Sequence, residues 1–417
     1  MRTAADRRLL GRALRGRAMR RRVVIHWGIS SFFGWGVYGL NLALHWSRDP
    51  ELEPIASMPI REDQIAVDPL KRLALQPFLV QSASLVGKLS PFQNTPVTVD
   101  GPLLCALGND FSSTPLRAGV PFAGRPSIGV VFFEVPQLDA ATLERARAFP
   151  LIVAGSTWNE RILRAYGLTN VTTVIQGVDP TLFHPAPKGG ALGDRFLVFS
   201  GGKLELRKGQ DLVVAAFKRF AARHPDAMLV TAWHSPWPQF ARTLDASGFV
   251  APIPFDANER VDAKGWARAN GIADHQFLDL GAVPNAHMPT VLREMDVALF
   301  TNRSEGGTNL VAMECMACGV PTILSANTGH LDLIGEENCY VLARQQPHGG
   351  AGAAVGDVPG WGESDVDEAV DLLERAYADR TDARRRGLRG ADTLSRLTWA
   401  RTAADMKRVV LDQISRI

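Results

Sequence analysis

Short apolar runs alternate with helical patterns along most of the chain, which is typical of parallel sheets covered by helices. In the first half, apolar runs predict strands at 23–25, 53–57, 103–107, 128–133, 151–154 and 171–175. A second alternating set predicts strands at 196–200, 228–232, 277–280, 297–300 and 322–324. Between the first two of these, residues 211–222 carry one apolar stripe at helical spacing. Two Rossmann-like halves are the simplest packing for this pattern.

The domain boundaries follow from length and from breaks in the pattern. At 417 residues the chain is too long for one ordinary core, so two domains are expected. A proline- and glycine-rich segment at 176–193 predicts the interdomain linker, and the glycine-rich stretch 349–362 predicts a mobile loop. Helices are expected at 365–376, in the segment after it and at 398–417. The predicted division is a basic leader at 1–22, a first Rossmann-like domain at 23–185, a second at 186–395 and a C-terminal helix at 396–417.

Charge is unevenly distributed. Residues 1–22 hold nine arginines against one acid, Asp6, a local balance of +8, so the remainder carries 3 − 8 = −5. A mildly acidic body argues against nucleic acid as the main partner, because binding it needs a basic face on the fold itself. The leader has apolar residues at helical spacing, and two interpretations stay open: it lies on an anionic membrane surface, or it is a solvated tail.

The run 23–47 contains no charged side chain and is long enough to span a bilayer, for which about 20 residues suffice. Its glycines and polar residues lower its hydrophobicity, so a strand, a glycine loop and a helix starting near Leu40 fit it better. Four cysteines are too few for a disulfide scaffold and fit a reducing compartment. We therefore expect a cytoplasmic protein, peripheral at the inner face of the membrane if the leader binds lipid.

The segment 304–321 predicts a glycine turn that is followed directly by a helix. Thr308 or Asn309 can cap the helix start. Gly306 and Gly307 let backbone N–H groups approach an anion, and the helix dipole favours negative charge there. The turn therefore predicts a phosphate site.

Glu314 lies within the same apolar helix, and a buried carboxylate needs a partner. Lys203 follows the strand at 196–200, while Arg207 and Lys208 open the next helix. Cations at a helix N-terminus cost about 0.3–1 kcal/mol each unless an anion lies between them. The alternative is a solvated basic loop. Together with the glycine turn, these cations predict a diphosphate site at the carboxyl edge of one sheet.

From about Val23 to its end, the chain resembles a family 4 glycosyltransferase of the GT-B fold. The motifs that carry this resemblance are Gly202-Lys203, Lys208-Gly209, Gln176-Gly177-Val178-Asp179, Gly281-Ala282-Val283-Pro284, Glu305 with Glu314, and Trp399. The resemblance implies an α/β fold in which two Rossmann-like domains face each other across a cleft and the C-terminal helix crosses back to the first domain. It also implies transfer of a sugar, with retention, from a nucleoside diphosphate sugar to a glycan, lipid-linked or other acceptor. The resemblance places such a transfer in surface polysaccharide or glycoconjugate synthesis. It also implies that the reaction needs no cofactor and no catalytic metal.

The resemblance also assigns roles. Glu314 would bind the nucleotide ribose, Glu305 the sugar hydroxyls, and Lys203 with Lys208 the diphosphate. Further donor contacts are expected from Gly34, Gly36, Gly202, Arg207, Val283, Gly306, Gly307, Thr308, Asn309 and Leu310.

Two departures from the family pattern bear on these roles. One extra residue separates the two glutamates compared with the family pattern. Counted back from Glu314, Gly306 therefore stands where the family usually has its first glutamate, and Glu305 lies one residue earlier. The first domain has Glu134 where the family commonly offers a histidine, so Glu134 is expected to face the reacting sugar, with Asn109 or Asp110 as alternatives.

Two other functions remain as alternatives. Gly34-x-Gly36-x-x-Gly39 has the spacing of a dinucleotide-binding turn, although the expected acid about 20 residues on is missing. An NAD-dependent oxidoreductase would use that turn. The other alternative is a noncatalytic GT-B module that binds a glycan or acts as a scaffold.

Overall fold

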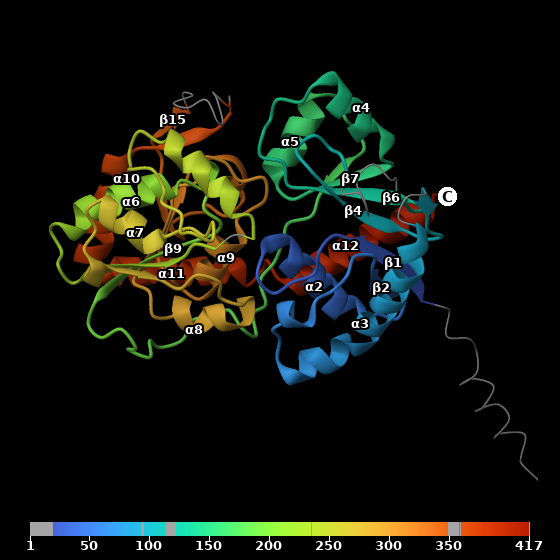
Figure 1. The fold of residues 1–417 in the computed structure, drawn as a ribbon, viewed down its shortest axis with the longest axis horizontal. Helices are drawn as coiled ribbons and strands as arrows, with labels where there is room; N and C mark the ends of the chain where they lie inside the picture. The colour runs from blue at the N-terminus through green and yellow to red at the C-terminus, as the bar shows by residue number, and fades with distance from the viewer. Residues whose placement is uncertain are drawn as a thin grey trace, which may run out of the picture.

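The computed structural model describes residues 20–92, 96–113, 122–234, 236–348, 358 and 360–416. It contains two α/β units side by side, each built on a six-stranded sheet with helices on its faces (Figure 1). Both sheets are parallel throughout. The alternating pattern of the sequence therefore does form two Rossmann-like layers. The basic leader up to residue 19 and the glycine-rich stretch 349–357 lie outside the described residues.

The first sheet has the strand order β2-β1-β4-β6-β7-β8. Its order reverses between β1 and β4, where a doubly wound sheet opens a crevice at the strand ends. The strands are β1 (Arg21–His26), β2 (Leu52–Ala56), β4 (Leu103–Leu107), β6 (Ser127–Val131), β7 (Leu151–Ala154) and β8 (Val171–Thr173).

The second sheet has the order β11-β10-β9-β12-β13-β14, which is the doubly wound order of dinucleotide-binding folds. The order reverses between β9 and β12, so the second crevice lies at the carboxyl ends of these strands. The strands are β9 (Phe196–Gly201), β10 (Ala227–Ala232), β11 (Phe277–Asp279), β12 (Val297–Phe300), β13 (Thr322–Ser325) and β14 (Tyr340–Leu342).

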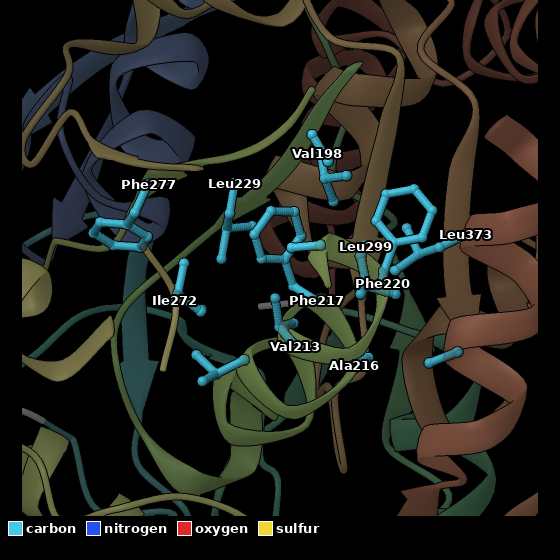
Figure 2. Close-up of a cluster of buried hydrophobic side chains, with 14 of the residues drawn as sticks. Val198, Val213, Ala216, Phe217, Phe220, Leu229, Ile272, Phe277, Leu299 and Leu373 are labelled. Atoms are coloured by element: carbon cyan, nitrogen blue, oxygen red, sulfur yellow. The ribbon is translucent and has the colours of Figure 1, made fainter. Parts of the chain in front are cut away.

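Helices cover both faces of each sheet. In the first unit they are α2 (Gly34–Trp46), α3 (Pro69–Leu89), α4 (Ala140–Ala148) and α5 (Thr157–Ala165). In the second they are α6 (Gln210–Ala221), α7 (Ala263–Ala269), α8 (Met288–Leu292), α9 (Leu310–Ala317), α10 (Val366–Ala378) and α11 (Arg380–Leu394). The predicted stripe of α6, with Val213, Phe217 and Phe220, packs against the second sheet and α10 (Figure 2).

The last helix, α12 (Trp399–Ile414), leaves the second unit and packs on α2 of the first (Figure 1). The Trp399 ring stacks on Tyr38 with 5.7 Å between centroids, and the Trp46 indole donates to the Ala403 carbonyl at 3.1 Å. Because α2 is covered by the sheet on one side and by α12 on the other, it is apolar almost all round. This is the crossing that the resemblance implies.

The two chain crossings between the units lie against each other. Val178 donates to the Leu397 carbonyl at 2.9 Å, and Trp399 donates back to the Val178 carbonyl at 3.1 Å. A Cβ atom on Gly177 would lie 2.1 Å from the Thr398 carbonyl carbon, so glycine is required for this close approach. The predicted linker is therefore tied down at its start.

One local prediction was wrong, and two helices of the first unit were missed. Helix α2 begins at Gly34, so the glycines expected to form a loop before the helix lie inside it. The helices α3 and α4 were not anticipated, because α3 contains Pro77 and buries few apolar residues and α4 is short. No described helix has the length and hydropathy needed to cross a bilayer.

Candidate active site

A pocket of about 300 Å³ lies between the two units, at the carboxyl ends of both sheets. Its walls come from the segment after β1, the end of β6, the loop after β9 and the turn after β12. These segments follow strands at or next to the points where the two strand orders reverse. The topology therefore brings together predicted residues that lie up to 280 positions apart, Gly34 and Glu314 among them.

The turn between β12 and α9 forms the floor of the pocket. Asn309 caps α9: its backbone is left-handed, with φ 62°, and its side chain accepts from the Ala312 N–H at 3.4 Å. A Cβ atom on Gly306 would lie 2.3 Å from the Phe132 carbonyl oxygen. The Ser156 hydroxyl also donates to the Gly306 carbonyl at 2.7 Å. Gly306 is thus needed for close packing of the two units, which the sequence interpretation had not recognised.

Lys203 and Lys208 both reach this pocket from the loop after β9. The chain leaves β9 through Gly202, which has φ 116°, and forms a short 3-10 turn at Leu206–Lys208 before α6. Lys203 Nζ lies 3.0 Å from Glu205 Oε2, and Lys208 Nζ lies 2.5 Å from Glu305 Oε1. Each of the two lysines is therefore paired with a carboxylate, and Glu305, the partner of Lys208, also lines the pocket.

Arg207 is the centre of a buried ion cluster. Its guanidinium lies 3.3 Å from Glu134 and 3.4 Å from Glu305, pairs with Glu205, and donates to the Ser304 carbonyl at 2.8 Å. Burial alone would lower the pKa of Arg207, but the three carboxylates outweigh burial and raise it. Arg207 lines the pocket as predicted, yet its donors are taken up by protein groups.

Glu305 is buried and fully engaged. Its carboxylate accepts from Lys208, Arg207 and the Asn302 amide. Burial opposes ionisation, but Lys208 and Arg207 hold the pKa of Glu305 at about 2. Burial lowers the pKa of Lys208, and Glu305 offsets part of that effect. Both Glu305 and Gly306 line the pocket, so the extra residue in the turn does not carry Glu305 out of it.

Glu314 has a different environment, although it lines the same pocket from the first turns of α9. It is buried, and its Oε1 accepts from the Asn285 side-chain amide at 2.5 Å. No described cation forms an ion pair with it, and burial raises its pKa to about 8 despite the Asn285 contact. The carboxyl group therefore keeps hydrogen-bonding capacity that no described cation takes up.

The raised pKa of Glu314 makes stability depend on pH. The folded pKa exceeds the ordinary value of 4.5, so ionisation costs folding free energy as pH rises from about 4.5 through 8. We expect E314Q to raise the free energy of unfolding by about 2–4 kcal/mol at pH 9 and to change it little near pH 4.5. Urea unfolding at the two pH values measures this. The exposed control E336Q should show no such pH-dependent difference, and an equal effect of E314Q at both pH values would contradict the assignment.

The first domain contributes Glu134 to the pocket, as predicted. Its carbonyl oxygen accepts from the Trp361 indole at 2.7 Å and the Ser304 hydroxyl at 3.2 Å, both from the second unit. The alternatives do not line the pocket: Asn109 accepts from the Glu134 N–H at 2.9 Å, and Asp110 bonds Ser112.

Most predicted donor contacts line the pocket, and two do not. The pocket includes Gly34, Gly202, Val283, Gly307, Asn309 and Leu310. Gly36 lies inside α2, where a Cβ atom would come within 2.6 Å of the Ser30 backbone, so it serves helix packing and not a ligand. Thr308 is buried, and its hydroxyl faces the Met313 sulfur at 3.0 Å.

Sequence reasoning missed the aromatic side of the pocket. Four partly buried rings of the first unit line it, and we call them the aromatic wall: Phe32, Phe33, Trp35 and Phe132. Trp35 meets Phe132 edge to face, with 4.7 Å between centroids, and Phe33 meets Trp237 of the second unit at 6.1 Å. The density of aromatic residues between Trp27 and Tyr38 was the available signal.

Among the described residues, no group of three or more His, Cys, Asp or Glu side chains is arranged to hold a metal ion.

The four cysteines are buried, and burial raises the pKa values of Cys105, Cys315, Cys318 and Cys339.

One family model and two curated proteins match part of this chain. Residues 186–348 match the family model described as Glycosyl transferases group 1. The chain is 26% identical over 241 residues to the GDP-mannose-dependent alpha-(1-6)-phosphatidylinositol monomannoside mannosyltransferase of Mycolicibacterium smegmatis, covering 54% of this chain and 56% of that protein. It is 29% identical over 256 residues to the D-inositol 3-phosphate glycosyltransferase of Stackebrandtia nassauensis, covering 59% of this chain and 49% of that protein. The matched region thus spans about half the length of these relatives.

Solved structures match nearly the whole chain. Sucrose-phosphate synthase from Thermosynechococcus elongatus superposes with a TM-score of 0.65 at 18% identity, covering 95% of this chain and all of that one. Anabaena Alr3699/HepE in complex with UDP and glucose gives 0.61 at 12% identity, covering 94% of this chain and 100% of that one. At these identities the likeness concerns the fold alone, and it confirms the predicted GT-B architecture.

Proposed function

We propose that this chain is a glycosyltransferase that takes a sugar from a nucleoside diphosphate sugar bound between its two domains. The observation that carries the proposal is the convergence of two lysines, two helix starts and two buried carboxyl groups, Glu305 and Glu314, on a single interdomain pocket. A nucleoside diphosphate sugar combines the anionic and hydroxyl groups that such a set would bind.

The two helix starts support an anion between the domains. A Cβ atom on Gly34, at the start of α2, would lie 3.9 Å from the Leu310 side chain, at the start of α9. Helix α2 has no side-chain cap, so its first N–H groups lack that partner. Each start carries partial positive charge, and two such ends face each other favourably only when an anion lies between them.

The lysines would act on the leaving group. When the bond between the sugar C1 and the phosphate oxygen breaks, the diphosphate takes the electron pair and gains negative charge. Lys203 and Lys208 would stabilise that charge, releasing Glu205 and Glu305 from their ion pairs. The acceptor oxygen bonds to C1, and its proton passes to the departing phosphate oxygen.

Glu314 and Glu305 would bind the rest of the donor. The Glu314 carboxyl lies beside Asn285 and the turn containing Val283, a position suited to ribose hydroxyls. Glu305 would face the sugar hydroxyls, and Glu134 would face the reacting carbon from the first domain. Arg207 would hold the three carboxylates Glu134, Glu205 and Glu305 in place and would not contact phosphate directly.

The finer parts of the proposal rest on the family resemblance. They are membership of family 4, transfer with retention, and a role in polysaccharide or glycoconjugate synthesis on a glycan or lipid-linked acceptor. The named activities of the two curated relatives, one using GDP-mannose, agree with this chemistry. We further propose that the two lysines make a catalytic metal unnecessary, and that the protein acts in the cytoplasm with its basic leader on an anionic membrane surface.

Calorimetry and donor hydrolysis test the proposal. The purified chain is expected to bind at least one of UDP, GDP and ADP and to hydrolyse the matching nucleotide sugar slowly without an acceptor. NAD is expected to give no heat signal, because two glycines of the Gly34-x-Gly36-x-x-Gly39 motif pack inside α2. Binding of NAD without binding of any nucleoside diphosphate would contradict the proposal.

A noncatalytic GT-B module remains the second candidate, and one observation favours it. Both oxygens of Glu305 are already engaged by Lys208, Arg207 and Asn302. A contact between Glu305 and the donor sugar would therefore have to form when the donor binds. Nucleotide binding without hydrolysis of any sugar donor would support this candidate.

A further inference from the structure

The two walls of the pocket differ in their side chains. The described lining residues of the second domain include three cations, Lys203, Arg207 and Lys208, together with the acids Glu305 and Glu314. Those of the first domain include one ionisable side chain, Glu134, and the aromatic wall of Phe32, Phe33, Trp35 and Phe132. The donor diphosphate belongs with the cations and with the backbone N–H groups at the start of α2, so the rings of the aromatic wall are left for the acceptor.

From this asymmetry we infer that the acceptor is an uncharged sugar ring, held against the aromatic wall with a hydroxyl toward Glu134. This inference rests on the proposed function and goes beyond it by naming the class of acceptor. It excludes acceptors that carry phosphate or carboxylate on the ring that enters the pocket.

The aromatic wall has the chemistry to bind one face of a pyranose. The face of an aromatic ring carries negative charge density, so it attracts the weakly positive C–H groups of a sugar and does not attract an anion. The rings are also held in place: Phe132 packs edge to face on Trp35, and a Cβ atom on Gly307 would lie 2.9 Å from the Phe132 ring. Preorganised rings lose little conformational freedom when a ligand binds.

Glu134 supplies the polar group that such a site needs. A pocket with apolar walls fixes its ligand through a few placed polar atoms. Arg207 holds the Glu134 carboxylate at 3.3 Å, and the Trp361 indole holds its backbone. The carboxylate can accept a hydrogen bond from a hydroxyl, whereas it would repel a phosphate on the acceptor.

The first test measures transfer to matched pairs of acceptors. It uses the full-length chain and a sugar donor that this chain hydrolyses. Nitrophenyl glycosides of neutral hexoses and the same glycosides carrying a 6-phosphate are the probes. We expect kcat/KM to be at least about tenfold higher for the neutral member of a pair, a difference of about 1.4 kcal/mol. Equal use or preference for the phosphorylated member would overturn the inference.

The second test asks which substrate the aromatic wall binds. F32A is expected to raise the acceptor KM about tenfold with a donor KM within about twofold of the original, because only the acceptor loses apolar contact. W35L, which keeps an apolar side chain, is the second variant should F32A fold poorly. F249A is the matched control, since Phe249 is exposed and lies outside the pocket, and both KM values should stay unchanged.

The outcomes separate the inference from the function on which it rests. A donor KM that rises as much as the acceptor KM in F32A and W35L would assign the aromatic wall to the donor and overturn the inference. So would unchanged acceptor KM in both variants. A chain that binds no nucleoside diphosphate in calorimetry contradicts the proposed function itself, and the acceptor inference falls with it.

Discussion

Replacing Lys208 by alanine is expected to lower kcat/KM for the sugar donor by about 10²-fold or more. The Lys208 ammonium lies beside Glu305 in the pocket that the start of α9 also lines, where the diphosphate would gain charge as it leaves. Removing it takes away charge stabilisation that grows as the diphosphate leaves. Steady-state kinetics with saturating acceptor measure the loss, and K203A should give a loss of the same order.

A control must separate catalysis from folding, because K208A leaves Glu305 buried without its nearest cation. The double variant K208A/E305Q removes that unpaired charge, so it should regain stability without regaining activity. K264A is the matched surface control, since Lys264 is well exposed and outside the pocket, and it should behave like the original chain. Unchanged kinetics in both K203A and K208A would refute the diphosphate site.

The second large effect is expected in stability. R303L should lower the free energy of unfolding by about 3–5 kcal/mol, the usual cost of leaving one member of a buried ion pair alone. Arg303 forms two hydrogen bonds with Asp211, of 2.8 and 2.7 Å, and both side chains are almost fully buried. Arg303 also donates to the Leu206 carbonyl at 2.7 Å. The pair therefore anchors the loop that carries Lys208 to the turn that carries Glu305.

A double-mutant cycle measured by urea unfolding tests this pairing. R303L/D211L should be less destabilised than the sum of its single variants, because the double variant leaves neither charge of the Arg303–Asp211 pair buried alone. The exposed pair Arg396–Asp392 is the control, and R396L should change stability by about 0.5 kcal/mol or less. Additive effects at Arg303 and Asp211 would contradict a direct ion pair.

The fold was accessible from local pattern because parallel strands buried on both faces read as continuous apolar runs. Strand β4 spans Leu103–Leu107, as predicted, and the strand expected at 297–300 is β12 (Val297–Phe300). Helix α3 escaped prediction for the opposite reason. Most of its surface is exposed, and Leu70 and Leu73 face outward, so no helical apolar stripe marks it.

The candidate site was partly accessible as well. Glu314 stood out because an acid inside an apolar helix is costly, and the structure leaves that carboxyl with a raised pKa, facing the pocket. Gly36 was misassigned because spacing alone cannot tell a glycine that meets a ligand from one that meets a neighbouring backbone. Lys203, Lys208 and Glu305 were predicted, but the pairing of Lys208 with Glu305 and the presence of Glu205 beside Lys203 were not.

By itself, the sequence determined the two parallel layers, the glycine turn before α9 and the residue types able to bind a diphosphate and a polyol. These depend on periodicity, capping and the cost of burying charge, which act over a few residues. Only the tertiary structure decided that Arg207 sits among three carboxylates, that Gly306 packs on the Phe132 backbone, and that an aromatic wall faces the lysines. Several of those contacts join segments that lie far apart in the chain, some of them across the two domains, and no local pattern encodes which distant side chain will meet which.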